Sequence, residues 1–262
     1  MKVKKGVNEA NSIPRRAIVT GAAHGLGLAI AQRLAAEDAY LLLVDRDEVV
    51  LSRVSEKGFD PTRTFAIAKD LSDSDEDSVV FEKAAASIGL VDTLINNAAW
   101  SFHKPMTEVT TVEFDRLVNI NQRAPFFLAK QFFKQIAATT TGPADPVIIN
   151  IASVNALAGN PNLVAYAGTK GALVAMTRAM AVEMSELKIR VNAICPAAVD
   201  TYVTGQLIAS GEIDPSKIVA NFLVKRFASC EEIADLVAYL CSSSATYVNG
   251  ATLEIDGGYL AQ

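Results

Sequence analysis

The chain has 262 residues, half of them hydrophobic and a fifth charged, so it is long enough to bury the core of one large domain. Its net charge of −5 and its lack of a basic stretch with interleaved aromatics argue against nucleic acid as a partner. No uncharged apolar run reaches the roughly 18 residues that a membrane span needs, so we expect no membrane association.

The N-terminus and the cysteines indicate a cytoplasmic protein. Residues 1–15 are rich in lysine and arginine and lack the apolar core of a signal peptide, so we expect a flexible lead-in before a single domain over residues 16–262. Cys195, Cys230 and Cys241 are odd in number and form no CxxC pair, which is typical of free thiols in a reducing cytosol. The only histidines are His24 and His103, so we predict no metal site.

Seven short apolar runs predict strands, and helical stretches lie between most of them. The runs are Ala17–Thr20, Tyr40–Val44, Thr64–Ala68, Val91–Ile95, Val147–Ile151, Ile189–Ile194 and Thr252–Ile255. Continuously apolar strands that alternate with helices predict an α/β fold whose doubly wound parallel sheet is covered on both faces. Small or polar residues recur just after the strands, at the edge where such sheets bind ligands. Residues 201–225 break the alternation, and we expect them to cover the substrate as a lid.

A glycine-rich turn, Thr20–Gly27 (TGAAHGLG), follows the first predicted strand and opens a helix. Glycines let the backbone approach a pyrophosphate closely, and the free N–H groups of a helix start favour the anion. We therefore expect Gly21, Gly25, Leu26 and Gly27 to bind a dinucleotide. His24 is a further candidate for a phosphate contact, although a lone histidine in a turn is more often a bystander.

Asp45 follows the second predicted strand, 18 residues after Gly27. A carboxylate at this place accepts hydrogen bonds from the adenosine ribose and repels a 2′-phosphate, so NAD is favoured over NADP. The adjacent Arg46 is the counter-argument, because a guanidinium pairs well with that phosphate.

The joint order of these and further motifs resembles the short-chain dehydrogenase/reductase family, from about Arg16 to Tyr259. The motifs are Thr20–Gly27, Asp45, Asp70 with Leu71, Asn96–Ala99 (NNAA), Asn121, Ser153, Tyr166–Lys170 (YAGTK) and Asp256–Gly258 (DGG). The resemblance implies a Rossmann-like fold, a nicotinamide cofactor and a homotetramer, in which the DGG segment usually packs at a subunit interface.

Tyr166 and Lys170 are four residues apart on a predicted helix, so they share one face. A lysine cation beside a phenol lowers the pKa of the phenol, which lets tyrosine act as an acid or base nearer neutral pH. The resemblance assigns that role to Tyr166, substrate orientation to Ser153, and binding of the nicotinamide ribose to Lys170.

Asn121 lies four residues before Pro125 in what reads as one helix. Proline has no N–H, so the Asn121 carbonyl loses its helical partner and is able to bind water. The resemblance implies that Asn121 holds a water connecting Lys170 to solvent. A simple proline kink is the alternative reading.

The resemblance also implies the remaining cofactor contacts. Asp70 and Leu71 are expected at the adenine, and Thr201 at the nicotinamide carboxamide beside the Val199 backbone. Asn97, Ala98 and Pro196 complete the expected cofactor site. Two positions depart from the family pattern, Ala99 and Ala197, where glycine is usual, and alanine is disfavoured wherever φ is positive.

The expected substrate walls mix polar and apolar side chains, and no arginine stands among them, which disfavours strongly anionic substrates. The site candidates are Trp100, His103, Ser153, Asn155, Ala198 and Tyr202, and further wall candidates are Phe102, Leu157, Leu207, Ile208, Phe222 and Leu223. We therefore expect an NAD-dependent oxidoreductase for a secondary alcohol or ketone such as a sugar, polyol or cyclic diol. An NADPH-dependent carbonyl or 3-ketoacyl thioester reductase is the alternative, and a non-catalytic dinucleotide sensor is a third.

Overall fold

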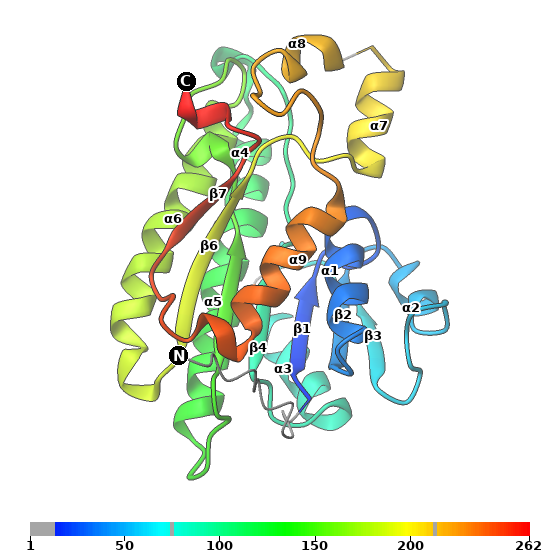
Figure 1. Ribbon diagram of the computed structural model, residues 1–262, viewed down its shortest axis with the longest axis vertical. Helices are drawn as coiled ribbons and strands as arrows, with labels where there is room; N and C mark the ends of the chain where they lie inside the picture. Colours follow the sequence, from blue (N-terminus) through cyan, green and yellow to red (C-terminus); the bar gives the residue numbers. More distant parts are fainter. Residues whose placement is uncertain (1–13, 74–75, 212–213) are drawn as a thin grey trace, which may run out of the picture.

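The computed structural model describes residues 14–73, 76–211 and 214–262. Within them, seven parallel strands form one sheet in the order β3-β2-β1-β4-β5-β6-β7, which confirms the predicted fold class (Figure 1). The strands are β1 (Arg16–Thr20), β2 (Tyr40–Asp45), β3 (Thr64–Ala68), β4 (Thr93–Asn96), β5 (Val147–Ile151), β6 (Arg190–Pro196) and β7 (Thr252–Ile255). The strand order reverses direction between β1 and β4, and ligands bind at such switch points.

Helices cover both faces of the sheet, which explains why its central strands are apolar throughout. One face packs against α1 (Gly25–Ala35) and α9 (Cys230–Cys241), and the other against α3 (Glu76–Ser87), α5 (Ala124–Ala137) and α6 (Val164–Glu183). The remaining helices are α2 (Val50–Arg53), α4 (Thr111–Val118), α7 (Tyr202–Ala209) and α8 (Pro215–Val219), with 3₁₀ turns at Met106–Glu108, Val154–Ala156, Ser185–Leu187, Ser243–Ala245 and Tyr259–Ala261. Every residue of β4, β5 and β6 is buried, as expected for parallel strands between two helical layers.

The fourth strand begins two residues later than its apolar run predicts. Both main-chain groups of Val91 are bonded to a side chain, since its N–H donates to Gln135 Oε1 at 3.2 Å and its carbonyl accepts from Gln135 Nε2 at 2.9 Å. Val91 is buried, but Gln135 of α5 takes the place of a neighbouring strand. The apolar run therefore predicts correctly that Val91 is buried, but it overestimates the length of the hydrogen-bonded strand.

Residues 1–13 of the expected lead-in lie outside the described part, and Arg15 directly precedes β1. The Arg15 guanidinium donates to Asp145 Oδ2 at 3.1 Å and lies 3.7 Å from Asp92 Oδ1. Asp145 also receives two hydrogen bonds from the buried Arg190. Arg15 thus belongs to an ion-pair cluster at the amino-terminal edge of the sheet.

The helical run that contains Asn121 and Pro125 is continuous, as predicted. Between α4 and α5 it widens into a π-helix, Asn119–Arg123, in which Ala124 N–H bonds to the Asn119 carbonyl. Pro125 stands in the first turn of α5, where a missing N–H costs least. Among the described residues, no helix is both long and apolar enough to cross a bilayer.

Candidate active site

A cavity of about 860 Å³ opens at the carboxyl ends of the strands. Its walls come from the turns after β1, β2, β4, β5 and β6 and from the segment around α8. All sixteen residues that we expected at the cofactor line this one cavity, namely Gly21, His24, Gly25, Leu26, Gly27, Asp45, Arg46, Asp70, Leu71, Asn97, Ala98, Tyr166, Lys170, Pro196, Val199 and Thr201.

The glycine turn between β1 and α1 has no room for a side chain at Gly21 or at Gly27. A Cβ on Gly27 would lie 2.0 Å from the Gly21 carbonyl oxygen, and one on Gly21 would lie 2.8 Å from Asn97 Nδ2. Gly21 also has a φ of +67°, in the region that favours glycine. The spacing of the motif is therefore set by how closely the backbone folds on itself.

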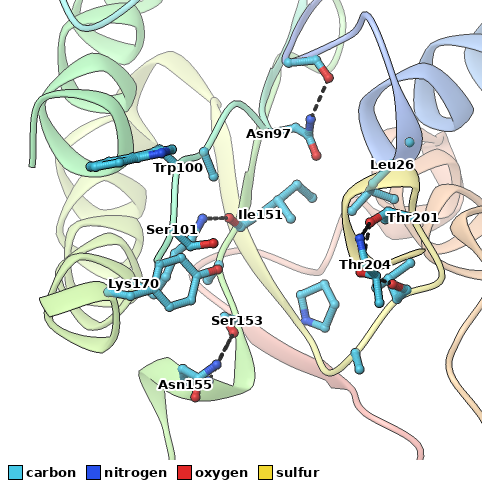
Figure 2. A pocket seen from close by; sticks show the side chains of 18 of the residues that line it. Leu26, Asn97, Trp100, Ser101, Ile151, Ser153, Asn155, Lys170, Thr201 and Thr204 are labelled. Carbon is cyan, nitrogen blue, oxygen red and sulfur yellow. Dashed lines mark hydrogen bonds between the residues drawn. The ribbon is translucent and has the colours of Figure 1, made fainter. Parts of the chain in front are cut away.

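Asn97 and Thr20 brace this turn from the end of β4. The Asn97 side chain donates from Nδ2 to the Thr20 carbonyl at 2.9 Å and to the Gly21 carbonyl at 3.2 Å, and one of these bonds is drawn in Figure 2. In return, Thr20 Oγ1 accepts from the N–H groups of Asn97 and Ala98, both at 3.0 Å. Asn97 therefore shapes the cofactor cradle by holding its backbone.

The start of α1 fits the pyrophosphate of a dinucleotide. Its first turn has no side-chain cap and no acidic residue, so its N–H groups and the positive end of its dipole face the cavity. His24 precedes the helix, but its imidazole is turned to its neighbours: Nε2 lies 2.9 Å from Asp47 Oδ2, and Nδ1 lies 3.2 Å from an Arg53 nitrogen. The free backbone of this turn, more than His24, is therefore suited to an anion.

Asp45 ends β2 beside this turn. Its carboxylate accepts from Ala23 N–H and from Asp47 N–H, both at 3.0 Å, which fixes its direction along the cavity wall. Each carboxylate oxygen retains a lone pair for a further donor such as a ribose hydroxyl. Arg46 is exposed and lines the same wall.

Ser153, Tyr166 and Lys170 meet at the other end of the cavity. Ser153 follows β5, and Tyr166 and Lys170 project from successive turns of α6. Tyr166 and Ser153 both line this end of the cavity, and hydrogen bonding by Ser153 lowers the pKa of Tyr166. Lys170 is buried and donates from Nζ to the Ile151 carbonyl at 2.7 Å (Figure 2). Its ammonium lies 5.8 Å from the centre of the Tyr166 ring.

Burial dominates the acid–base properties of this pair. It raises the pKa of Tyr166 to about 12, and the hydrogen bond with Ser153 offsets only part of that rise. Burial also lowers the pKa of Lys170 to about 8. The pKa of Tyr166 therefore lies above its usual value, contrary to the expectation that Lys170 lowers it, because desolvation is the largest effect on this phenol.

Asn121 is buried and does not line the cavity. Its Oδ1 accepts from Trp100 N–H and its Nδ2 donates to the Trp100 carbonyl, both at 2.8 Å, and Nδ2 also donates to Thr169 Oγ1 at 3.2 Å. The side chain thus ties the loop after β4 to α6, and its main-chain carbonyl is the group that Pro125 has no N–H to bond.

The two departures from the family pattern are accommodated without strain. Ala99 is not among the residues with positive φ, and it lines the cavity with an exposed side chain. Ala197 also lines the cavity, and its N–H donates to the Ile255 carbonyl at 3.3 Å. Each methyl therefore narrows the cavity without distorting the backbone.

The predicted substrate walls are only partly recovered. Trp100, His103, Ser153, Asn155, Ala198 and Phe222 line the cavity. Phe102 packs edge-on against Trp100, while Leu157, Ile208 and Leu223 are outside the lining. The side chains of Tyr202 and Leu207 lie outside the part of the chain that the structure describes.

Several lining residues escaped the sequence analysis. They are Asn160, Pro161, Leu163, Asp214, Lys217, Ile218, Asn221, Phe227 and Tyr259. Two signals were available: the GNPN turn lies between Ser153 and Tyr166, and Tyr259 directly follows the DGG motif. The residues of α8 carry no such signal, because their place at the cavity depends on how the chain folds after β6.

The segment after β6 begins with a capped helix. Thr201 is the N-cap of α7, and its Oγ1 accepts from Thr204 N–H at 3.1 Å, while Thr204 Oγ1 donates to the Val199 carbonyl at 2.9 Å (Figure 2). Lys217, on α8, is 84% exposed and lies 3.9 Å from Asp214. A cation that the sequence analysis did not foresee therefore stands at the cavity wall.

Comparison with known proteins agrees with this geometry. A family model described as enoyl-(acyl carrier protein) reductase matches residues 21–260. The chain is 34% identical to L-xylulose reductase from Bos taurus over 94% of its own length and 97% of that protein. Among solved structures, 3-ketoacyl-(acyl-carrier-protein) reductase from Brucella melitensis complexed with NADH is similar at a TM-score of 0.82 and 31% identity, covering 93% of this chain and 97% of that one.

A second solved structure, ElxO with NADP bound, has a TM-score of 0.86 and 25% identity, covering 95% of this chain and all of that one. These similar proteins thus carry either nicotinamide cofactor. The family model and the relative both span nearly the whole chain, and they confirm the resemblance that the motifs indicated. The chain belongs to the short-chain dehydrogenase/reductase family of oxidoreductases.

Proposed function

We propose that the protein transfers a hydride between NAD(H) and a secondary alcohol or ketone, with Tyr166 as the proton donor or acceptor. The carrying observation is that Ser153, Tyr166 and Lys170 line the same cavity as the glycine turn and Asp45. When bound, the nicotinamide supplies the hydride acceptor or donor. The names of L-xylulose reductase and the ketoacyl reductase, both of which act on a carbonyl, support this reaction class.

In the oxidative direction, the Tyr166 oxygen takes the hydroxyl proton of the alcohol while the carbinol C–H bond breaks and its electron pair leaves as hydride. In the reductive direction, Tyr166 returns the proton to the oxygen of the former carbonyl. Ser153 holds that oxygen, and Lys170 binds the ribose and favours the phenolate by its charge. For Asn121 we propose that the main-chain carbonyl holds a water on the path from Lys170 to solvent, since the side chain is already bonded.

The preference for NAD rests on Asp45. Its carboxylate lies at the end of β2 with lone pairs available for the ribose hydroxyls, and Asp47 adds a second negative charge to the same wall. Two carboxylates oppose a 2′-phosphate. We infer that NAD is the working cofactor and that the enzyme runs mainly toward the ketone.

The substrate is a neutral, hydroxylated molecule such as a sugar, a polyol or a cyclic diol. His103 offers a polar group and Trp100 an aromatic face at the cavity wall. The 201–225 segment closes over the substrate as a lid, a role supported by the α8 residues in the lining.

An NADPH-dependent carbonyl or 3-ketoacyl thioester reductase is the second candidate. Arg46 lines the adenosine end and supplies positive charge of the kind that a 2′-phosphate needs. Arg53 lies outside the cavity lining, where its guanidinium bonds to the Ala23 carbonyl at 2.8 Å, to His24 and to Glu56. A sensor without catalytic activity is disfavoured because Ser153, Tyr166 and Lys170 are all present.

We also propose a homotetramer in the cytoplasm. Exposed apolar side chains on α4, α5 and the start of α6, among them Val112, Phe114, Phe126 and Val164, support association of copies. The three cysteines are free and buried, which suits a reducing compartment. Light scattering of the purified protein would give the mass of the assembly, and a monomeric mass would refute the tetramer.

The first experiment follows reduced nicotinamide by near-ultraviolet absorbance with NAD or NADP and a panel of sugars, polyols, cyclic diols, steroids and simple secondary alcohols. We expect turnover with NAD that falls by about 10²–10⁴-fold in Tyr166→Phe, the usual contribution of a positioned general acid or base. NADH binding, measured by fluorescence, serves as the control for an intact site. Equal or better turnover with NADP, or full activity in Tyr166→Phe, would overturn the proposal.

A further inference from the structure

A chain of polar side chains runs from Ser153 to the C-terminal segment. Asn155 Nδ2 donates to Ser153 Oγ at 3.2 Å, as Figure 2 shows. Asn160 Nδ2 donates to Asn155 Oδ1 at 2.7 Å, and the Tyr259 hydroxyl donates to Asn160 Oδ1 at 3.1 Å. The chain joins three parts of the sequence along one wall of the cavity, and neither Asn160 nor Tyr259 belongs to the motifs described above.

All three bonds point the same way. The Tyr259 hydroxyl gives its only hydrogen to Asn160, each asparagine accepts through its oxygen on the outer side, and each donates through its nitrogen toward Ser153. Bonds aligned in one direction polarise one another, so the Asn155 amide is a stronger donor than it would be alone.

This direction determines the orientation of the Ser153 hydroxyl. Ser153 Oγ also accepts from the main-chain N–H of Asn155 at 3.2 Å, so both of its lone pairs are used. Only its hydrogen is left to share. Tyr166 lines the same cavity, and hydrogen bonding by Ser153 lowers the pKa of Tyr166, an effect that requires Ser153 to donate and the Tyr166 oxygen to accept.

The outer end of the chain is held firmly. The Tyr259 ring packs edge-on against Phe222, with ring centres 5.9 Å apart. Asp256 accepts from the N–H groups of Gly258 and Leu260, both at 2.8 Å, and Gly258 has a φ of +82° where a Cβ would lie 2.6 Å from Leu223. The DGG motif therefore fixes the direction of Tyr259 within one chain.

We propose that Asn155, Asn160 and Tyr259 form a positioning relay that, before substrate binds, turns the Ser153 hydroxyl hydrogen toward the Tyr166 oxygen and so favours the phenolate. When substrate enters, the same hydrogen is the one that Ser153 donates to the substrate oxygen. The inference rests on the proposed function, because it assumes that Tyr166 is the acid or base. The three relay residues act through Ser153 and do not themselves exchange the substrate proton. Their contribution opposes burial, which disfavours the phenolate.

The sharpest test compares Asn155→Asp with Asn155→Ala. A carboxylate has nearly the shape of the amide but accepts where the amide donates, so it draws the Ser153 hydrogen away from Tyr166 and adds a negative charge nearby. We expect the apparent pKa in the pH profile of kcat/KM to rise by about one pH unit or more in Asn155→Asp, and by about half a unit in Asn155→Ala. If Asn155 only filled space, Asn155→Asp would change the pKa less than Asn155→Ala, because aspartate conserves the shape of the side chain. That order would overturn the relay.

Asn160→Ala and Tyr259→Phe break the relay farther from Ser153. We expect the apparent pKa in the pH profile of kcat/KM to rise in both variants. The rise should be smaller in Asn160→Ala than in Asn155→Ala and smallest in Tyr259→Phe, while the affinity for NADH stays unchanged. Tyr247→Phe is the matched control, because that side chain is fully exposed and removal of its hydroxyl leaves the profile in place. Wild-type profiles in both relay variants would refute the relay.

A measurement without substrate separates this inference from the proposed function. In protein labelled with ¹³C at the tyrosine Cζ carbon, the Tyr166 signal, assigned by its loss in Tyr166→Phe, reports ionisation of the phenol. We expect a smaller ionised fraction at a fixed high pH in Asn160→Ala than in the wild type. If Tyr166→Phe retains turnover while the Asn160→Ala signal changes, the proposed function fails and the relay stands. If Tyr166→Phe is inactive while that signal is unchanged, only the relay fails.

Discussion

The two ends of the cavity are built on different principles. At the cofactor end, the glycine turn, Asn97 and Asp45 are held by main-chain hydrogen bonds and by contacts too close for any added methyl group. At the substrate end, the lining comes from loops after β4 and β5, from α8 and from the C-terminal Tyr259.

The difference shows where the structure restricts the residue type at a position and where it does not. A backbone that folds to within contact of itself admits only glycine, so the cofactor end has a narrow choice of sequence. A wall of side chains on separate loops is closed by whatever fills the space, so many sequences satisfy it. We expect mutations at the first end to abolish binding and comparable mutations at the second to alter it.

The largest contrast is expected between two glycine substitutions. In Gly27→Ala the new Cβ would lie 2.0 Å from the Gly21 carbonyl oxygen, whereas in Gly205→Ala, on α7, it meets nothing within 4 Å. We expect Gly27→Ala to lose about 1–3 kcal/mol of stability and most of its NADH affinity. Gly205→Ala should be neutral or gain about 0.5–1 kcal/mol, as alanine does inside a helix.

Thermal unfolding and NADH fluorescence measure both effects on the same samples. Comparable losses in the two variants would show that the close approach at Gly27 is not what sets the motif spacing. A loss of stability and NADH affinity confined to Gly205→Ala would show that the segment containing α7 is more constrained than the cofactor end.

The same contrast explains what the sequence predicted. The strands and the cofactor wall were accessible because apolar runs mark buried strands and because the turn after β1 needs glycine. Lys217 was missed because nothing local to it signals a site. Asn160 and Tyr259 lie next to recognisable segments, the GNPN turn and the DGG motif, but their place in the cavity depends on how loops more than 40 residues apart meet. The pKa of Tyr166 was misjudged for a related reason, since the spacing to Lys170 shows a neighbour but not the depth of burial.

Lys170 lies where the two ends meet, and its burial makes stability depend on pH. Its folded-state pKa of about 8 is below the ordinary value of 10.5, so the unfolded chain binds the extra proton between these values. Stability therefore rises with pH through that window, and the full cost of the buried charge is present below pH 8. We expect the free energy of unfolding of Lys170→Met to exceed that of the wild type by about 1–3 kcal/mol at neutral pH. This difference should close toward pH 10.5.

Denaturant unfolding across this pH range measures the gap. Burial raises the pKa values of Cys195, Cys230 and Cys241, so stability falls above pH 9 in both proteins. The effect of Cys230 and Cys241 cancels in the difference, whereas that of Cys195 does not cancel fully, because the Lys170 charge lowers the pKa of Cys195. Lys217→Met is the matched control on an exposed lysine and should show no such window. A gap that is independent of pH would contradict a lowered pKa of Lys170.

A smaller effect is expected from charge removal at Asp45. Asp45→Asn keeps an oxygen that accepts from Ala23 N–H but removes the charge that repels a 2′-phosphate. We expect the ratio of kcat/KM for NADP to that for NAD to rise by about tenfold, the worth of one charged hydrogen bond. Asp60→Asn, an exposed turn residue outside the cavity, is the control. An unchanged ratio would favour the reading in which Arg46 selects the cofactor.

The smallest effect is expected at Lys217, on the wall that side chains alone close. Its ammonium is 84% exposed and lies 3.9 Å from Asp214, so solvent and this carboxylate screen its charge. For a neutral substrate, Lys217→Ala should change KM by less than about twofold and stability by less than about 0.5 kcal/mol. Measuring KM at low and at high salt tests this directly. A KM that rises severalfold in the variant, and only at low salt, would mean that the substrate is an anion attracted by Lys217. The lack of an arginine among the expected substrate walls would then be a poor guide to the substrate class, because an exposed lysine takes its place.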